Sequence, residues 1–280
     1  MTHLSGLLIE IRNLLSGRSD SPGLDAQVLL AHVLAKPRAW IIAHPEYMLT
    51  PEQRIRLKES LSRLQDGELL PYILGHWEFF GLDFAININT LIPRPETELL
   101  VENALAWLHA HLSRRRAADV GTGSGCIAVA LAAHITDLHL LASDISLPAL
   151  RIARYNARKH VVEDRVHCVQ SNLLPPTCQR FDLICANLPY IPTHTLQGLS
   201  VHGREPNLAL NGGENGLQAI SSLILEAPSQ ILPAGLLLFE IEASQGPTVA
   251  LLARQAFPEA EINILPDLAG HDRLLTVQTP

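Results

Sequence analysis

The chain has 280 residues, of which 47% are hydrophobic and 18% are charged, and its formal net charge is −7. No apolar run reaches the roughly 18 residues that suggest a membrane span, so we expect a soluble protein that has no membrane partner. The negative charge disfavours a general affinity for polyanions, and nucleic acid is not an expected substrate.

The N-terminal residues and the cysteines indicate a cytoplasmic protein without a metal. Residues 1–15 read MTHLSGLLIEIRNLL, where Glu10 and Arg12 interrupt the apolar residues, so we expect an amphipathic helix rather than a secretory signal. The cysteines form no C-x-x-C pair and lie in apolar segments, which favours free buried thiols; they are Cys126, Cys168, Cys178 and Cys185. Because no H-E-x-x-H motif occurs either, we expect no metal.

Residues 1–74 are predicted to form a small all-helical domain. Thr50, Pro51 and Gln53 have the pattern of a helix start, with a capping hydroxyl, a proline at the first helical position and a glutamine that reaches back. The apolar segment 25–35 supplies another helix. These segments contain no group of residues typical of catalysis, so we expect this domain to serve substrate recognition.

The sequence periodicity changes after the helical domain. Apolar and polar residues alternate from Leu82 to Asn89 with Gly81 before them, so residues 75–92 are predicted to form a β-hairpin linker. From residue 93 onward strand-like and helical segments alternate, which is typical of a parallel sheet with helices on both faces. The expected strands are 117–120, 140–144, 166–170, 181–186, 235–241, 261–265 and 274–278. Residues 93–280 are therefore predicted to form a doubly wound α/β domain.

Ligands of such sheets bind beyond the carboxyl ends of the strands, and the first of these ends is rich in glycine. Gly121, Gly123 and Gly125 lie between a predicted strand and a helix, where glycine permits a sharp turn and a close approach of a ligand. The third glycine comes one residue too early for the phosphate-binding pattern G-x-G-x-x-G. The spacing from Asp119 onward instead resembles the first motif of Rossmann-like methyltransferases that use S-adenosyl-L-methionine. The resemblance implies that this loop lies under the amino-acid and ribose parts of the cofactor, with the binding residues Gly121, Thr122, Gly123, Ser124 and Gly125.

The next two strand ends carry further candidate cofactor ligands. Asp144 ends its strand about 20 residues after the glycines, where a carboxylate accepts hydrogen bonds from both ribose hydroxyls. Ser146 is placed to cap the following helix, which is expected to leave Asp144 free for the cofactor. Asn172 follows the third strand and can bond to the adenine ring, although an acidic residue is more common there in the methyltransferases that this chain resembles. Leu173 is expected to cover the ring with apolar surface.

Asn187, Leu188, Pro189 and Tyr190 close the fourth predicted strand. They resemble the N-P-P-Y motif of methyltransferases that act on planar amide-like or aromatic amino groups. Such a nitrogen is a poor nucleophile because its lone pair is delocalised, and two acceptors for its two hydrogens hold it in line with a methyl donor. The Asn187 side-chain oxygen and the main-chain carbonyl of residue 188 are the expected acceptors, with Asn187 also near the cofactor. Tyr190 is expected to stack on the flat group, Leu188 keeps the carbonyl of the proline that it replaces, and Pro189 keeps residue 188 extended.

The chain resembles the HemK/PrmC family of release factor glutamine methyltransferases over nearly its whole length. The segments that carry this resemblance are 70–84 (LPYILGHWEFFGLDF), 91–105 (LIPRPETELLVENAL), 204–217 (REPNLALNGGENGL) and the closing D-x-x-G-x-x-R of Asp267, Gly270 and Arg273. The resemblance implies a Rossmann-like domain with a seven-stranded mixed sheet and S-adenosyl-L-methionine as cofactor. It also implies that the methyl acceptor is the glutamine of the Gly-Gly-Gln loop in class I peptide chain release factors. On its residues alone, the segment LIPRPETE would be a proline-stiffened lead into a helix that Thr97 caps.

Three other functions are compatible with parts of this pattern. A related enzyme that methylates a glutamine of a large-subunit ribosomal protein is the first alternative. An adenine amino-methyltransferase that acts on DNA is the second, although the acidic balance and the lack of an added target-recognition segment disfavour it. A scaffold that binds the cofactor without catalysis is the third, and it would leave Asn187 and Tyr190 without a role.

Overall fold

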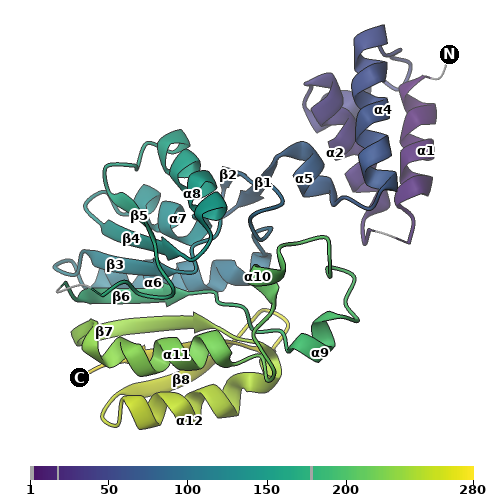
Figure 1. Cartoon of the computed structure of the whole chain (residues 1–280). Coiled ribbons are helices and arrows are strands. Elements are labelled where there is room, and N and C mark those ends of the chain that lie inside the picture. The colour runs from purple at the N-terminus through teal and green to yellow at the C-terminus, as the bar shows by residue number, and fades with distance from the viewer. Residues whose placement is uncertain (1–2, 18, 177–178) are drawn as a thin grey trace. The chain divides into compact units, whose positions relative to one another are not determined.

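The chain is described by a computed structural model that covers residues 3–17, 19–176 and 179–280. It divides into two compact units, Met1–Gly75 and His76–Pro280 (Figure 1). The described helices are all too short or too polar to span a lipid bilayer.

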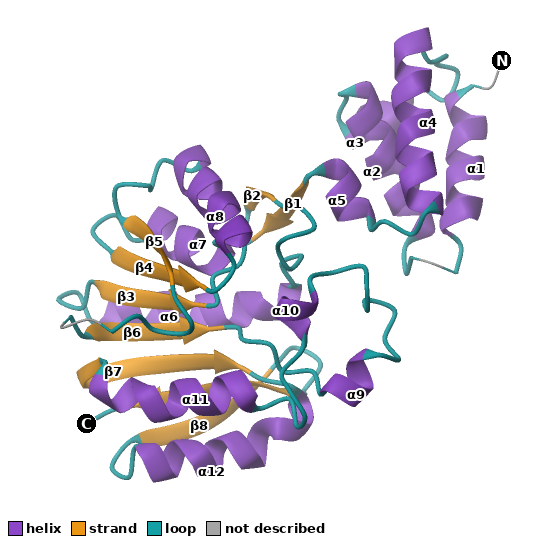
Figure 2. Ribbon diagram, viewed as in Figure 1, coloured by secondary structure: helices purple, strands orange, loops and turns teal. Residues whose placement is uncertain are grey.

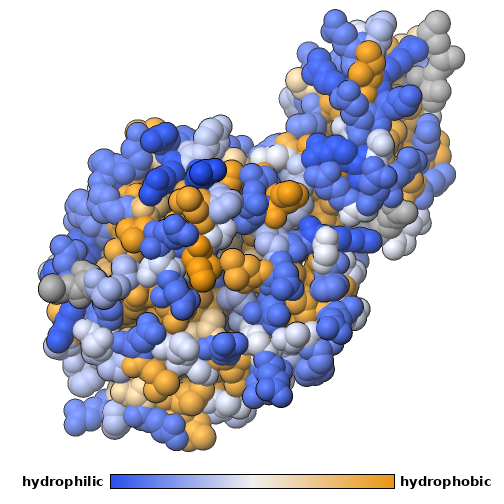
Figure 3. Space-filling model, in the orientation of Figure 1, coloured by the Kyte–Doolittle hydropathy of each residue, from blue (hydrophilic) through white to orange (hydrophobic). Residues whose placement is uncertain are grey.

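The first unit consists of helices only. Their bounds are α1 Leu4–Leu15, α2 Pro22–Leu34, α3 Arg38–Ala43, α4 Pro51–Gln65 and α5 Leu70–Leu74. The predicted start of α4 is confirmed, because the Thr50 hydroxyl accepts a hydrogen bond from Gln53 N at 3.3 Å and Gln53 Oε1 accepts one from Thr50 N at 3.0 Å. Helix α4 buries Leu57 and Leu64, and the visible surface of this unit is mostly hydrophilic (Figure 3).

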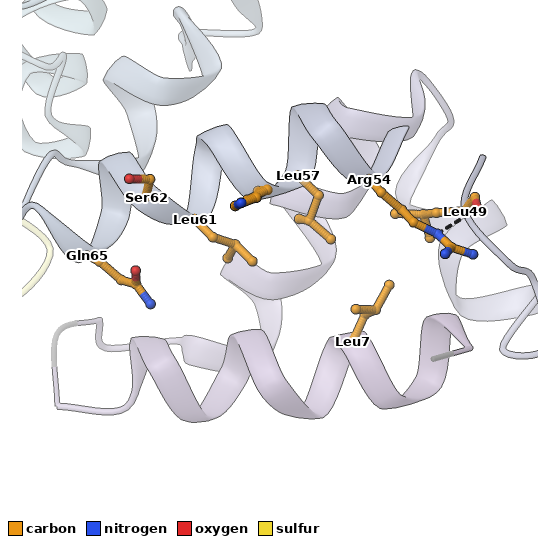
Figure 4. A pocket seen from close by; sticks show the side chains of 8 residues that line it. Leu7, Leu49, Arg54, Leu57, Leu61, Ser62 and Gln65 are labelled. Atoms are coloured by element: carbon orange, nitrogen blue, oxygen red, sulfur yellow. Dashed lines mark hydrogen bonds between the residues drawn. The ribbon is translucent and has the colours of Figure 1, made fainter. Parts of the chain in front are cut away.

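A groove of about 510 Å³ runs between α1 and α4 in this unit. Figure 4 shows Leu7 of α1 pointing towards Leu57 and Leu61 of α4. Arg54 lies at one end of the groove, where its Nε donates a hydrogen bond to the Leu49 carbonyl oxygen at 3.1 Å. Exposed polar side chains form the rim, so the groove has an apolar floor and an open, hydrophilic edge.

The second unit begins with the predicted β-hairpin, which is confirmed. Strands β1 (His76–Phe79) and β2 (Leu82–Ala85) pair antiparallel. Phe80 and Gly81 connect them with φ angles of 51° and 71°, the two positive values that a tight hairpin turn requires.

The rest of the second unit is built on one seven-stranded sheet with the order β5-β4-β3-β6-β7-β9-β8. The strands are β3 Arg116–Val120, β4 His139–Asp144, β5 Val166–Gln170, β6 Phe181–Ala186, β7 Ile231–Glu240, β8 Glu261–Pro266 and β9 Asp272–Gln278. Strand β9 runs antiparallel to β7 and β8, while the other pairs are parallel. The predicted fold class, a doubly wound α/β domain with a mixed sheet, is confirmed.

Helices cover both faces of this sheet (Figure 2). Helices α6 (Glu98–Ala110), α7 (Cys126–His134) and α8 (Leu147–Lys159) pack on one face, and α11 (Gln218–Glu226) and α12 (Gly246–Ala256) pack on the other. Neighbouring strand residues point to opposite faces, so Ala117 joins the core under the first group and Ala118 the core under the second. The remaining short helices are η1 Pro95–Thr97, α9 Thr193–Leu196, α10 Asn207–Leu210, η2 Ala227–Ser229 and η3 Ala243–Gln245.

Two details of the sequence analysis need correction. Strand β7 begins at Ile231, four residues before the predicted start at 235, and a register shift opposite Phe181 and Leu183 accommodates the extra residues. Pro233 and Gly235 had hidden this beginning because both are turn-forming residue types. Among the three described cysteines the thiols are free as expected, but only Cys185 is buried; Cys178 lies outside the described residues.

Candidate active site

Strands β3 and β6 lie side by side where the strand order of the sheet reverses. From β3 the chain adds β4 and β5 on one side, and from β6 it adds β7 on the other. At such a point a crevice opens beyond the carboxyl ends of the two strands. Val120 at the end of β3 pairs with Ala186 at the end of β6, so the loops that follow both strands start at the same level. The predicted site residues follow β3, β4, β5 and β6.

The glycine loop after β3 combines close packing with open space. Gly121, Gly123 and Gly125 have φ angles of 73°, 56° and 81°, which glycine adopts without strain. A Cβ at Gly121 would lie 2.9 Å from Cδ2 of Leu188, and one at Gly125 would lie 3.1 Å from Cα of Ala153. At Gly123 the nearest atom would be a backbone oxygen 3.9 Å away. The middle of the loop therefore leaves room for a ligand to lie against the backbone.

Asp119 holds this loop from below. Its Oδ2 accepts hydrogen bonds from the Thr122 hydroxyl at 2.5 Å and from Ala128 N at 3.2 Å. Its Oδ1 is buried and has no hydrogen-bond partner among the described residues. Burial raises the pKa of Asp119 to about 6, and the nearby Asp144 charge adds to the increase, while the two hydrogen bonds oppose it. The Thr122 side chain thus supports the loop from within the protein.

Asn156 of α8 anchors the far end of the loop. Its Nδ2 donates to the Ser124 carbonyl oxygen at 2.8 Å and to the Ala85 carbonyl oxygen at 2.9 Å. Its Oδ1 accepts a hydrogen bond from Ala85 N at 2.8 Å. The side chain is fully buried, so all of its polar atoms are used to join the glycine loop to strand β2.

Asp144 at the end of β4 lies next to the glycine loop. Gly123 N donates to its Oδ2 and Ser146 N donates to its Oδ1, each at 2.8 Å. The predicted cap is confirmed, since the Ser146 hydroxyl accepts from Ala149 N at 3.3 Å. The expectation that this cap leaves Asp144 free is wrong, because each carboxylate oxygen already accepts one backbone N–H. Burial raises the pKa of Asp144, and a carboxylate with about four acceptor positions keeps two for a ligand.

The residues after β5 form the outer wall of this edge. Asn172 is exposed, whereas Leu173 is half-buried and packs against the core beneath α11 and α12. Leu173 has a φ angle of 60°, which costs a non-glycine residue energy and persists only where the surroundings fix it. The two side chains therefore differ in role, with Leu173 anchored and Asn172 facing solvent.

Asn187 and Leu188 place two acceptors directly after β6. Asn187 Nδ2 donates a hydrogen bond to the Thr97 hydroxyl oxygen at 3.0 Å. Among the described residues, neither Oδ1 of Asn187 nor the carbonyl oxygen of Leu188 accepts a hydrogen bond. Asn187 is half-buried and the Leu188 side chain is buried against the glycine loop. Both oxygens are therefore unsatisfied at the strand end, as an acceptor pair for an external amide must be.

The predicted role of Thr97 as a helix cap is wrong. Thr97 precedes α6, but its φ and ψ angles of −68° and −19° are already helical because the short helix Pro95–Thr97 runs into α6. A capping side chain requires an extended backbone to reach the next free N–H groups, and Thr97 makes no such bond. Its buried hydroxyl faces Asn187 instead.

Glu240, the last residue of β7, lies beneath the same segment. Its side chain is buried, and its Oε1 accepts a hydrogen bond from the Tyr190 hydroxyl at 3.3 Å. Burial raises the pKa of Glu240, while the Thr97 hydroxyl, the Arg273 charge and the Tyr190 hydroxyl oppose that rise. Burial and the Glu240 charge raise the pKa of Tyr190, so this phenol stays protonated at neutral pH and donates.

The backbone of the Asn187–Tyr190 segment is held by the loop 211–217. Gln245 Nε2 donates to the Tyr190 carbonyl oxygen at 2.9 Å and to the Gly216 carbonyl oxygen at 3.1 Å. A Cβ at Gly216 would lie 2.2 Å from the Tyr190 oxygen, so only glycine fits there. The NGGENG turn is thus a backbone clamp on the predicted catalytic segment.

Two ion pairs join the other segments that carry the family resemblance. Arg94 pairs with Glu205, whose Oε2 also accepts a hydrogen bond from Ile92 N at 3.2 Å. Arg273 pairs with Asp267 at 3.2 Å, which directs this arginine towards the end of β7. The described residues include no group of three His, Cys, Asp or Glu side chains that could hold a metal ion.

The sequence analysis missed three residues that shape this site: Glu240, Gln245 and Asn156. Glu240 carried one usable signal, because a carboxylate that ends an apolar strand at the carboxyl edge of a parallel sheet is costly to bury without a purpose. Gln245 and Asn156 gave no such signal, since each acts on segments far away in the chain.

Comparison with known proteins agrees with this geometry. Residues 6–75 match the family model of the PrmC N-terminal domain, and residues 95–202 match that of the methyltransferase small domain. The chain is 41% identical over 278 residues to the release factor glutamine methyltransferase of Nitratidesulfovibrio vulgaris, covering 97% of this chain and 94% of that protein. It is 40% identical over 275 residues to the enzyme of the same name from Moorella thermoacetica, covering 98% of this chain and 97% of that protein.

A solved structure shows the same fold at low identity. The crystal structure of the hMettl16 catalytic domain in complex with MAT2A 3'UTR hairpin 1 has a TM-score of 0.56 and 18% identity, and it covers 90% of this chain and 93% of that chain. Because its curated relatives match it over nearly its whole length at about 40% identity, the chain belongs to the family of release factor glutamine methyltransferases.

Proposed function

We propose that this chain transfers a methyl group from S-adenosyl-L-methionine to the side-chain amide nitrogen of the glutamine in the Gly-Gly-Gln motif of class I peptide chain release factors. One observation carries the proposal: Asn187 Oδ1 and the Leu188 carbonyl oxygen, neither bonded by another described residue, follow β6 beside the glycine loop. Family membership supports the choice of a glutamine amide over other flat nitrogen groups.

The residues around the glycine loop fit the proposed cofactor. S-adenosyl-L-methionine carries its reactive methyl group on a positively charged sulfonium and has no phosphate. We assign its amino-acid part to the loop from Gly121 to Gly125, where the open space over Gly123 admits a ligand. We assign its ribose to the remaining acceptor positions of Asp144 and its adenine to Asn172 and Leu173.

The two acceptor oxygens act by orientation. An amide N–H₂ group has two hydrogens in one plane, so two acceptors fix both the position and the rotation of the nitrogen. Alignment of two bound reactants contributes up to roughly 10 kcal/mol to the reduction of a barrier. As the nitrogen gains the methyl group it becomes positive, and the same oxygens stabilise that charge until a proton leaves. Tyr190 is placed to cover the flat face of the amide, with Pro189 stiffening the chain between.

The helical and catalytic parts have separate proposed roles. We assign residues 1–74 to substrate recognition, 75–92 to a linker, and 93–280 to methyl transfer. The match of residues 6–75 to the PrmC N-terminal domain supports the first assignment. Because release factors act on ribosomes, this function places the reaction in the cytoplasm.

A labelling experiment tests the proposed substrate. The protein is incubated with S-adenosyl-L-methionine carrying a labelled methyl group and, in separate reactions, a release factor, the same factor with its motif Gln changed to Ala, a ribosomal protein extract, or DNA. We expect label only on the unmodified release factor. Equal labelling of the Gln→Ala factor, or label confined to ribosomal protein or DNA, would contradict the proposal.

A further inference from the structure

We propose that Thr97 and Glu240 are positioning residues that hold the Asn187 carboxamide with its oxygen towards the substrate amide. The inference rests on the proposed function and extends it, because it identifies what makes Asn187 an acceptor rather than a donor. Neither residue touches the reacting atoms in this account, so each acts through Asn187.

A free asparagine side chain does not prefer either orientation of its amide. Its oxygen and its NH₂ group have nearly the same shape, so rotation of the amide by half a turn exchanges an acceptor for a donor. An NH₂ group facing the substrate nitrogen would repel its hydrogens. The site therefore needs a partner on the other side of the Asn187 amide that binds NH₂ and rejects oxygen.

The Thr97 hydroxyl is that partner. It accepts a hydrogen bond from Asn187 Nδ2 at 3.0 Å, although a hydroxyl is by nature able to donate as well. Thr97 is buried, so water does not compete for the hydroxyl. If its hydrogen is committed elsewhere, only its lone pairs remain for Asn187.

Glu240 takes that hydrogen. An ionised carboxylate accepts and never donates, so a hydroxyl beside it must direct its hydrogen towards it. The Thr97 hydroxyl acts as a hydrogen-bond donor to Glu240, and among all influences on that carboxylate it is the strongest one that favours the charged form. Oε1 already accepts from Tyr190, while Oε2 is buried and has no hydrogen-bond partner among the described residues. Glu240 thus has spare accepting capacity next to Thr97.

The polarity of the chain of hydrogen bonds follows. Glu240 accepts from Thr97, Thr97 accepts from Asn187, and the Asn187 oxygen is left for the substrate. The donor chain begins at the buried end of β7 and ends at the exit of β6, so the sheet itself fixes its direction. The same carboxylate accepts from Tyr190, which fixes the ring expected to cover the substrate.

The test compares two substitutions of Thr97 that differ only in the hydroxyl. Thr97→Val removes the hydroxyl and keeps the shape, while Thr97→Ser keeps the hydroxyl. At saturating S-adenosyl-L-methionine we expect Thr97→Val to lower kcat for release factor methylation about 10- to 100-fold and Thr97→Ser to stay within about threefold. Cofactor Kd from calorimetry should change less than about twofold in both. Wild-type kcat in Thr97→Val, or equal losses in the two variants, would overturn the inference.

Glu240→Gln provides a second, near-isosteric variant. Gln keeps one acceptor but presents an NH₂ group that competes for the Thr97 oxygen, so we expect kcat to fall about 10-fold. Residues that act through one group are not additive, so the double variant Thr97→Val with Glu240→Gln should be no slower than the slower single variant. Losses that multiply would show that the two residues act separately and would overturn the inference.

Nuclear magnetic resonance gives a readout that does not depend on the substrate. The side-chain NH₂ signals of Asn187 are assigned by their disappearance in Asn187→Ala. We expect these signals to shift in Thr97→Val and Glu240→Gln but not in Thr97→Ser. If the wild-type enzyme failed to methylate a release factor, the proposed function would fall, while this spectrum would still decide the inference: unchanged signals in Thr97→Val would overturn it.

Discussion

The Asn187 side-chain amide donates a hydrogen bond to the Thr97 hydroxyl at 3.0 Å, although the two residues are 90 positions apart in the chain. This bond joins the segment before α6 to the segment after β6. It also fixes the face that Asn187 presents at the strand end, which is the face on which methyl transfer depends in our account.

Asn187→Ala should abolish methyl transfer and leave cofactor affinity nearly unchanged. The substitution removes one of the two acceptors for the substrate amide, whereas the glycine loop and Asp144 remain. Leu188→Ala is the matched control, because it changes the neighbouring side chain and keeps the main-chain acceptor. We expect Leu188→Ala to cost about 2 to 5 kcal/mol of stability and to retain transfer at a temperature where it is folded. Steady-state kinetics and cofactor titration measure both effects. Equal loss of transfer and of cofactor binding in Asn187→Ala would assign this residue to the cofactor.

Asp144→Ala should chiefly weaken cofactor binding. The carboxylate is the proposed acceptor for the ribose hydroxyls, and it also holds Gly123 N and Ser146 N, so its loss loosens the loop as well. We expect the KM for S-adenosyl-L-methionine to rise about 10- to 100-fold, as loss of two hydrogen bonds to a charged group implies. At saturating cofactor kcat should stay close to that of the wild type. A normal KM with a reduced kcat would refute the ribose assignment.

Gly216→Ala tests the clamp on the catalytic segment, with Gly203→Ala as its control. The two glycines have φ angles of 71° and 75°, so both substitutions carry similar backbone strain. An added Cβ meets the Tyr190 oxygen at 2.2 Å in the first case and nothing within 4 Å in the second. We expect Gly216→Ala to cost about 1 to 3 kcal/mol more stability than Gly203→Ala and to reduce methyl transfer. Urea denaturation and activity assays compare the pair; the same cost in both would mean that the clamp yields freely.

The sequence predicted those parts of the fold and the site that depend on local pattern. Alternation of strand and helix segments indicated the doubly wound domain, and the exit of the buried strand 181–186 into Asn187-Leu188-Pro189-Tyr190 was visible because polar and stiff residues interrupt an apolar run. The hairpin turn at Gly81 and the cap at Ser146 follow equally local rules. These features need only the chemistry of neighbouring residues.

The parts that the sequence did not predict depend on contacts between distant segments. Thr97 has the residue type and position of a helix cap, and only the folded chain shows that a preceding helical turn removes that role and that Asn187 takes its hydroxyl. Gln245 meets Tyr190 across 55 positions. No periodicity or spacing in a single sequence encodes such pairs, because each forms only when the sheet brings strand ends together.

The raised pKa of Asp119 predicts a pH-dependent stability. Burial raises this pKa from 3.8 to about 6, so between these values the folded chain keeps a proton that the unfolded chain has lost. In that window the unfolded state binds fewer protons, and the free energy of unfolding therefore falls as the pH rises. Asp119→Asn cannot ionise, so its stability relative to wild type should increase by up to about 3 kcal/mol between pH 4 and pH 7. Urea denaturation across this range measures the difference. A difference that stays constant with pH would contradict the buried, titrating carboxyl.

A structure of the enzyme with S-adenosyl-L-methionine, or an inert analogue, and a Gly-Gly-Gln peptide tests the central claim most directly. We predict that the glutamine nitrogen lies about 3 Å from both Asn187 Oδ1 and the Leu188 carbonyl oxygen and faces the donor sulfur. A glutamine nitrogen bound to other groups, with Asn187 and Leu188 turned away from it, would contradict the account.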